Sequence, residues 1–216
     1  MRKILFFLFI AFAFVACSQD AYETGDSALS YLRADMVDMH VIGKDVKSIV
    51  TDDGESLKFS SLHVSDKLAR PDTVYRALLY YNKVEGKDIE LVSSSIASLL
   101  VPTKDSKVKE MHPLTFTSGW VSANGKYVNL CLGLKVGKTD DGNTLQGLDI
   151  RLDEVKTDAE DHKHNYLTLL HDQNGMPEYY TETFYFSIPI DEYSKGDELH
   201  ITVNTYGGEV TRTFRK

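Results

Sequence analysis

Short segments in which apolar and polar residues alternate recur along most of the chain. The clearest one runs from Tyr127 to Val136, where apolar residues at every second position alternate with a second register that includes Asn129 and Cys131. A period of two is typical of a β-strand, because successive side chains point to opposite faces of the sheet. No comparable stretch beyond Cys17 has the 3.6-residue period of a long amphipathic helix. The pattern therefore predicts an all-β protein.

The first half of the chain predicts about five short strands, at residues 36–41, 48–51, 57–61, 73–83 and 89–92. The turn signal Asp52-Asp53-Gly54 separates two of them. A helix at residues 75–81 is the alternative, but the flanking Thr, Val and Tyr residues favour a strand. Five strands in about 70 residues suit a small barrel such as an OB-fold. We expect an OB-like domain over residues 31–101.

The second half predicts seven strands, at residues 114–121, 127–136, 148–155, 166–170, 179–190, 199–203 and 210–214. Turn signals separate them, the strongest being Asn124-Gly125. Strands and turns at this spacing indicate an antiparallel β-sandwich over residues 114–216. Residues 102–113 are charged and bracketed by prolines, which is typical of a linker between domains.

The N-terminal segment predicts a lipoprotein signal peptide. A basic start is followed by residues 4–16, which carry no charge. As a helix they would rise ~20 Å against ~30 Å of bilayer hydrocarbon, so a signal peptide suits them better than a membrane span. Ala16 precedes Cys17, as in a lipobox, although Phe14 stands where leucine is usual. The alternatives are an ordinary signal peptide cleaved elsewhere and a cytoplasmic chain that buries this segment.

We therefore expect residues 1–16 to be removed, Cys17 to carry lipid such as palmitate, and residues 17–30 to form a tether. The mature part is expected to be a soluble β-protein held at the cell envelope, with the outer membrane as the expected site. Several acyl chains on one residue give stable anchoring where a single chain is marginal. Whether the protein faces the periplasm or the cell surface stays open.

Charge and motifs exclude several functions. The net charge is −8, and loss of Arg2 and Lys3 with the signal makes the mature chain more acidic, which opposes binding to nucleic acid. Phosphate-binding loops, dinucleotide fingerprints and serine-hydrolase elbows are absent from the sequence, so no cofactor is expected. Once Cys17 carries lipid, Cys131 has no disulfide partner. Its position between two leucines indicates a packed small residue rather than a nucleophile.

Histidines and acids gather between the predicted strands near residue 160. A metal site there would draw on five residues: Asp158, Asp161, His162, His164 and the nearby His171. Two histidines separated by one residue share a face of a strand, and carboxylates complete many metal sites. The alternative is an exposed loop whose charges are simply solvated. By contrast, residues 140–143 lack the spaced ligands of a calcium loop and indicate a turn.

Four aromatic residues form a second candidate site, a binding surface for a protein or glycan: Trp120, Tyr127, Tyr179 and Tyr185. Tyrosine and tryptophan suit such contacts because they combine a large apolar ring with a polar group. The alternative places Trp120 in the core and the tyrosines half-buried along the rim of the sandwich.

In its whole mature part the chain resembles the NigD-like lipoproteins of Bacteroidota. The resemblance rests on Cys17-Ser18, on residues 74–101 and 118–136, and on the ending at residues 184–214. It implies an anchored envelope protein with an N-terminal OB-like domain and a C-terminal sandwich, and it carries no active site over. We therefore expect a non-enzymatic binding module with a protein or glycan partner. A metal-binding envelope protein using residues 158–171 and a polymer-degrading envelope enzyme are the alternatives.

Overall fold

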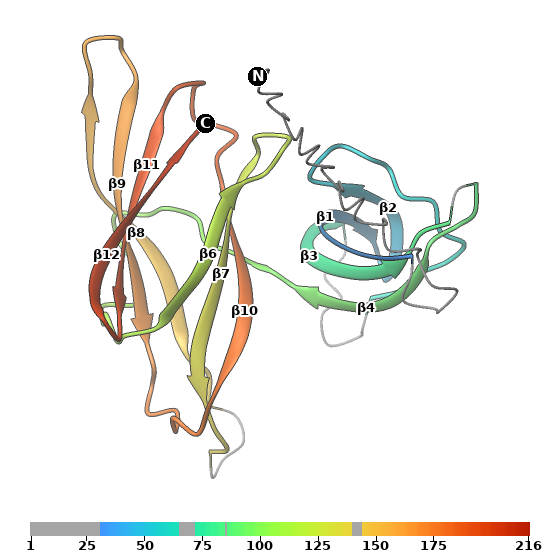
Figure 1. The fold of residues 1–216 in the computed structure, drawn as a ribbon, viewed down its shortest axis with the longest axis horizontal. Helices are drawn as coiled ribbons and strands as arrows, with labels where there is room; N and C mark the ends of the chain where they lie inside the picture. Colours follow the sequence, from blue (N-terminus) through green and yellow to red (C-terminus); the bar gives the residue numbers. More distant parts are fainter. Residues whose placement is uncertain (1–30, 65–71, 85, 140–143) are drawn as a thin grey trace, which may run out of the picture.

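The computed structural model describes residues 31–64, 72–84, 86–139 and 144–216, and within them it contains twelve β-strands in three four-stranded sheets (Figure 1). The predicted all-β class is confirmed. The predicted signal peptide, Cys17, the tether and the turn at residues 140–143 lie outside the described residues. Across the part of the chain that is described, no helix has the length and apolarity needed to span a membrane.

The N-terminal sheet is antiparallel and has the strand order β2-β1-β3-β4. Its strands are β1 (Leu32–Ile42), β2 (Asp45–Thr51), β3 (Thr73–Asn82) and β4 (Glu90–Ile96). The sheet curls around its own apolar core, which includes Ile49, Leu79 and Tyr81 (Figure 1). The strand predicted at residues 57–61 does not form. Leu57 is buried and its amide donates to the Ile49 carbonyl oxygen of β2, and the Lys58 carbonyl accepts from the Ile89 amide just before β4, but the segment pairs along neither strand.

The remaining strands form two sheets that face each other as a sandwich. The middle sheet contains β5 (Ser98–Leu99), β6 (Thr115–Val121), β7 (Tyr127–Val136) and β10 (Tyr180–Pro189), in the order β5-β10-β7-β6. The outer sheet contains β8 (Gly147–Thr157), β9 (Lys163–Asp172), β11 (Glu198–Thr205) and β12 (Gly208–Arg215), in the order β12-β11-β9-β8. One core joins them, with Leu130 and Ile188 on one side and Leu169 and Ile201 on the other. The predicted sandwich is thus confirmed.

One pairing in the outer sheet is parallel. Strand β10 crosses to the middle sheet, so β11 returns beside β9 and runs in the same direction. Their register places Glu198 opposite His164 and His200 opposite Tyr166. Side chains at alternate positions share a face, so His164, Tyr166, Glu198 and His200 lie on the same surface of the outer sheet.

The N-terminal sheet covers part of the middle sheet on the side that faces away from the sandwich core, over β7 and the end of β10, whereas β6 and the first half of β10 keep exposed residues. Almost all of β7 is buried, including Asn129 and Cys131 in its second register. Arg76 on β3 enters this contact and is 2% exposed. Its guanidinium donates to Ser187 (3.2 Å) and Asn129 (3.2 Å) of the middle sheet. It also donates to two carboxylates of its own half, Asp52 at 2.6 Å and Asp38 at 3.3 Å.

Residues 102–113, predicted to be a linker, run along the outer sheet. The amide of Thr103 donates to the Ile150 carbonyl oxygen, and the amide of His112 donates to that of His171. Ser106 is buried and its hydroxyl donates to Asp149 at 2.5 Å. The segment is therefore packed against the sandwich, and the domain boundaries at either side of it stay predictions.

Candidate functional site

The turn between β8 and β9 is built around the carboxylate of Asp158. Its Oδ1 accepts the backbone N–H groups of Glu160 and His162, both at 2.9 Å. Asp161 at the tip has a φ of 66°, a left-handed conformation that aspartate tolerates better than most residues. These hydrogen bonds, the one from the His162 amide first, lower the pKa of Asp158. Asp158 is therefore held ionised, with its second oxygen directed elsewhere.

That second oxygen, Oδ2 of Asp158, meets both predicted histidines of the segment. Nε2 of His164 lies 3.2 Å from it and Nδ1 of His162 lies 3.6 Å from it. His164 is in β9, whereas His162 precedes the strand and packs its ring against Gly196. The structure thus brings Asp158, His162 and His164 together, as the sequence predicted for a metal site.

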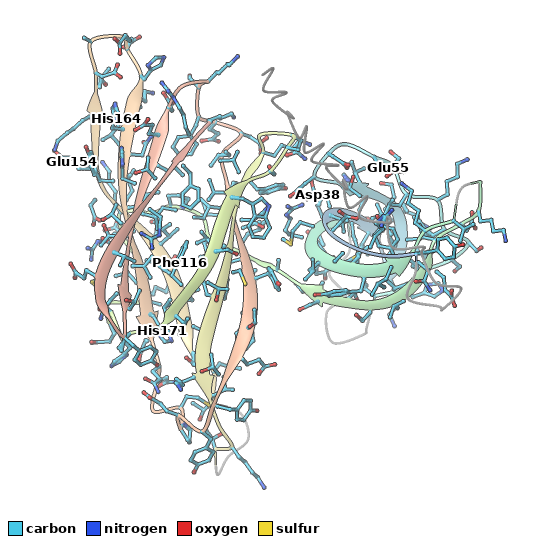
Figure 2. The ribbon with its side chains drawn as sticks, in the orientation of Figure 1. Asp38, Glu55, Phe116, Glu154, His164 and His171 are labelled. Atoms are coloured by element: carbon cyan, nitrogen blue, oxygen red, sulfur yellow. The ribbon has the colours of Figure 1, made fainter. Side chains whose placement is uncertain are left out.

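Strand β11 adds two residues that the sequence analysis did not single out, Glu198 and His200. Nδ1 of His164 lies 3.1 Å from Nε2 of His200. Oε2 of Glu198 lies 3.3 Å from the first nitrogen and 3.4 Å from the second. We call His164, Glu198 and His200, together with Asp158, the histidine–carboxylate cluster; Figure 2 marks its position through His164. Two imidazoles and a carboxylate at these distances can share protons or bind a metal ion.

Neighbouring side chains orient the cluster. Nδ1 of His200 lies 3.0 Å from the Thr213 hydroxyl, and its ring stacks on Tyr166 with centroids 4.8 Å apart. Nε of Arg215 lies 4.0 Å from Oε1 of Glu198, which leaves Oε2 to face the histidines. Burial lowers the pKa of His200, so its ring favours the neutral form that binds metals.

His171, the fifth predicted ligand, lies at the opposite end of β9 from His164 (Figure 2). Its ring is buried, with Nδ1 donating to the His112 carbonyl oxygen at 3.1 Å and Nε2 2.7 Å from Oε1 of Gln146. Burial lowers the pKa of His171. The structure therefore separates His171 from the other predicted ligands and surrounds it with packing partners.

The four predicted surface aromatics do not lie together. Tyr127 lies under the Arg76 guanidinium at 4.2 Å, and burial raises its pKa to about 12. Tyr185 packs beside Met36 and Leu78 of the N-terminal sheet. Trp120 is 37% exposed on β6, and Tyr179 is 74% exposed just before β10. Two of the four thus lie in the contact between the N-terminal and middle sheets, and Tyr179 is the most exposed of the set.

The sequence contained one signal for the residues that were missed. In β11 the apolar positions Leu199, Ile201 and Val203 alternate with Glu198 and His200, and this alternation places both polar residues on the face away from the core. The pattern did not indicate which strand would lie beside β11. Only the parallel pairing of β9 with β11 brings His164 to Glu198, and no local pattern encodes it.

No protein-family model matches the chain, and no curated protein matches it. Solved structures do share its fold. A NigD-like immunity protein from Bacteroides caccae has a TM-score of 0.61 and 22% identity, with 84% of this chain and 90% of that one covered. A protein of unknown function from Bacteroides vulgatus has a TM-score of 0.61 and 18% identity over 85% and 91% of the two chains. A candidate lipoprotein from Bacteroides fragilis has a TM-score of 0.59 and 12% identity over 85% and 97%.

These likenesses extend over both halves of the chain, the curled N-terminal sheet and the sandwich. The fold implied by the resemblance is therefore confirmed: this chain has the fold of the NigD-like proteins of Bacteroides.

Proposed function

We propose that this chain is a NigD-like lipoprotein of the cell envelope, anchored by lipid on Cys17, and that it binds a protein partner without catalysing a reaction. The observation that carries the proposal is the order of its parts. An uncharged segment too short to cross a bilayer ends at Ala16-Cys17, and the chain behind it has the fold of a candidate lipoprotein and of an immunity protein. The B. caccae protein is named for immunity, which supports a protective envelope role here.

Metabolic labelling with radioactive palmitate tests the anchor. Cells that make the full chain should yield a labelled protein in the membrane fraction. The Cys17→Ala variant should be unlabelled, because the thiol that accepts the lipid is gone. A wild-type chain that stays unlabelled, or that is found in the cytosol with residues 1–16 attached, would overturn the proposed anchoring.

Exposed apolar side chains at one end of the sandwich support the binding role. The large apolar residues exposed there are Leu145, Tyr179, Tyr180 and Tyr206. Lys135 on β7 lies between these residues: its backbone pairs with Thr181 on β10, and its Nζ lies 6.0 Å from the ring of Tyr206 in the turn between β11 and β12. Aromatic residues are enriched in protein interfaces, and this end lies opposite the β8–β9 turn that carries Asp158.

Crosslinking on intact cells tests the role of this end. A partner captured by the wild-type chain should be lost when Tyr179 and Tyr180 are both replaced by serine. Tyr31→Ser is the matched control, because Tyr31 is also half exposed but belongs to the other half of the chain. If the double variant still captures the partner as well as the control does, the partner binds elsewhere and this surface assignment is wrong.

A further inference from the structure

We propose that the histidine–carboxylate cluster binds one zinc ion, with Nδ1 of His164, Oε2 of Glu198 and Nε2 of His200 as its ligands. This site is independent of the proposed lipid anchor and of the exposed tyrosines. Two strands that pair in parallel supply the three atoms. Two imidazoles with one carboxylate form a ligand set that zinc uses in proteins.

The spacing of the three atoms fits such an ion. Zn–N and Zn–O bonds of roughly 2.0–2.2 Å place tetrahedral ligand atoms roughly 3.3–3.6 Å apart. The observed separations are 3.1 Å between the two nitrogens, 3.3 Å from His164 to Glu198, and 3.4 Å from His200 to Glu198. All three lie within a few tenths of an ångström of the required values. The ring planes lie 13° apart and the two nitrogens lie almost on the line between the ring centroids, which are 5.4 Å apart, so the lone pairs now point at each other. To direct both lone pairs at an ion at Zn–N distances of roughly 2.1 Å, each ring must turn by roughly 40°.

The protons around the two rings also fit. The carboxylate of Asp158 can accept the Nε2 proton of His164 at 3.2 Å, so the tautomer that leaves a lone pair on Nδ1 has a partner. Glu198 lies 3.3 Å from Nδ1 and can accept a proton there when no ion is bound. His200 must free Nε2 and carry its proton on Nδ1. Thr213 permits this, because its hydroxyl accepts from Nδ1–H as readily as it donates to a bare Nδ1. Histidine ligands commonly donate their other N–H group to a carboxylate or another oxygen.

Charge and access favour a cation as well. Zinc with two neutral imidazoles and the Glu198 carboxylate leaves one positive charge, and Asp158 lies beside it to balance that charge. The side chains of the three ligands are between 16% and 26% exposed. Water can therefore reach the fourth position. Three protein ligands with one open position are typical of sites where zinc acts or exchanges rather than of closed structural sites.

Calorimetric titration of zinc chloride into the full chain tests the site, with the protein purified in detergent, without a histidine tag, and stripped with a chelator. We expect one zinc ion per chain. Removing a ligand by Glu198→Gln or His200→Gln should weaken binding by about 100-fold or more, since even residues that only orient a ligand typically contribute 10–100-fold. Asp158→Asn should weaken it by about tenfold.

Two histidine variants serve as matched controls. His162→Gln removes a neighbouring ring that is not a proposed ligand, and His63→Gln removes an exposed ring paired with Asp45 at 2.8 Å. Both should bind zinc as the wild type does. Absence of zinc binding by folded wild-type protein, or unchanged binding by His200→Gln, would overturn the proposal.

A second measurement covers ligand variants that fail to fold. Cobalt(II) replaces zinc and reports its geometry by visible absorption. The wild-type chain should show the intense bands of tetrahedral cobalt, and excess zinc should remove them. The weak bands of six-coordinate cobalt would contradict the tetrahedral site.

Discussion

Two polar clusters in this molecule contain ionisable residues brought together from distant strands, and they differ in how completely the protein satisfies them. The arginine cluster consists of Arg76 with Asp38, Asp52, Asn129 and Ser187. Each guanidinium nitrogen of Arg76 donates to a side chain, and the acceptors come from both the N-terminal half and the middle sheet. Among its buried atoms only Oδ1 of Asp52 lacks a hydrogen-bond partner. Such a network holds the N-terminal sheet against the middle sheet.

In the histidine–carboxylate cluster, the inward-facing atoms are mainly acceptors rather than matched donors and acceptors. Three atoms that can each accept a proton or bind a metal face one another across β9 and β11. The outward sides of both rings are already bonded to Asp158 and Thr213. A closed network serves architecture, whereas converging acceptors with a water-accessible side suit a ligand. Mutations in the arginine cluster should therefore lower stability and leave zinc affinity unchanged, whereas mutations in the histidine–carboxylate cluster should lower zinc affinity.

Arg76→Met should have the largest effect on stability. The substitution keeps much of the side-chain volume but leaves the carboxylates of Asp38 and Asp52 largely buried without their cation. Breaking a buried pair in this way typically costs about 3–5 kcal/mol of unfolding free energy. Urea denaturation measures the change, and zinc affinity of the folded variant should stay at the wild-type value.

Arg151→Met provides the matched comparison on the surface. Arg151 contacts Asp153 at 2.6 Å, but their side chains are 38% and 32% exposed. Exposed pairs contribute about 0–1 kcal/mol, so the loss should be small. Equal losses for Arg76→Met and Arg151→Met would show that the arginine cluster does not hold the two sheets together.

The pH dependence of stability separates buried His171 from the histidine–carboxylate cluster. Burial lowers the pKa of His171 below its ordinary 6.5; the hydrogen bond to the His112 carbonyl opposes this shift, the charge of the His112 ring adds to it, and Asp172 opposes it. The unfolded chain therefore takes up a proton near pH 6.5 that the folded chain binds only at lower pH. The stability from neutral His171 is complete above that value and is lost as the pH falls towards the folded-state pKa.

Urea unfolding at about pH 7.5 and about pH 5.5 measures this loss. His171→Gln should lose less stability between the two values than the wild type does. Part of the loss should persist in the variant, because burial also lowers the pKa of His200. A variant with the same pH dependence as the wild type would show that His171 is not held in its neutral form.

The sequence predicted most strands because alternation is a local signal. Residues 127–136 were predicted as a strand, and β7 has the same bounds. The partner of each strand is not a local property. Tyr127 and Tyr185 point away from the sandwich core as expected, yet the N-terminal sheet covers them, and nothing in their own strands indicates that cover. The short strand β5, only two residues long, also gave no signal.

Only part of the candidate site was predicted, because the sequence shows which residues are close along the chain but not which strands pair. Asp158, His162 and His164 are close in sequence, so their proximity was readable. Sequence proximity also suggested His171, but seven positions along an extended strand place it ~23 Å away from His164. The residues that complete the cluster come from β11, which reaches β9 only because β10 joins the other sheet.

Thr213→Val should have the smallest effect, and it addresses the difference between the two clusters most directly. Valine keeps the shape of threonine but cannot accept the Nδ1 proton of His200. The metal-binding tautomer then loses its partner, and zinc affinity should fall by up to about tenfold. Thr211→Val on the same strand is the control, because its hydroxyl bonds Thr202 instead. Calorimetry would contradict the assigned proton arrangement if both variants bound zinc equally well, since the outward hydrogen bond of His200 would then be irrelevant to its inward nitrogen.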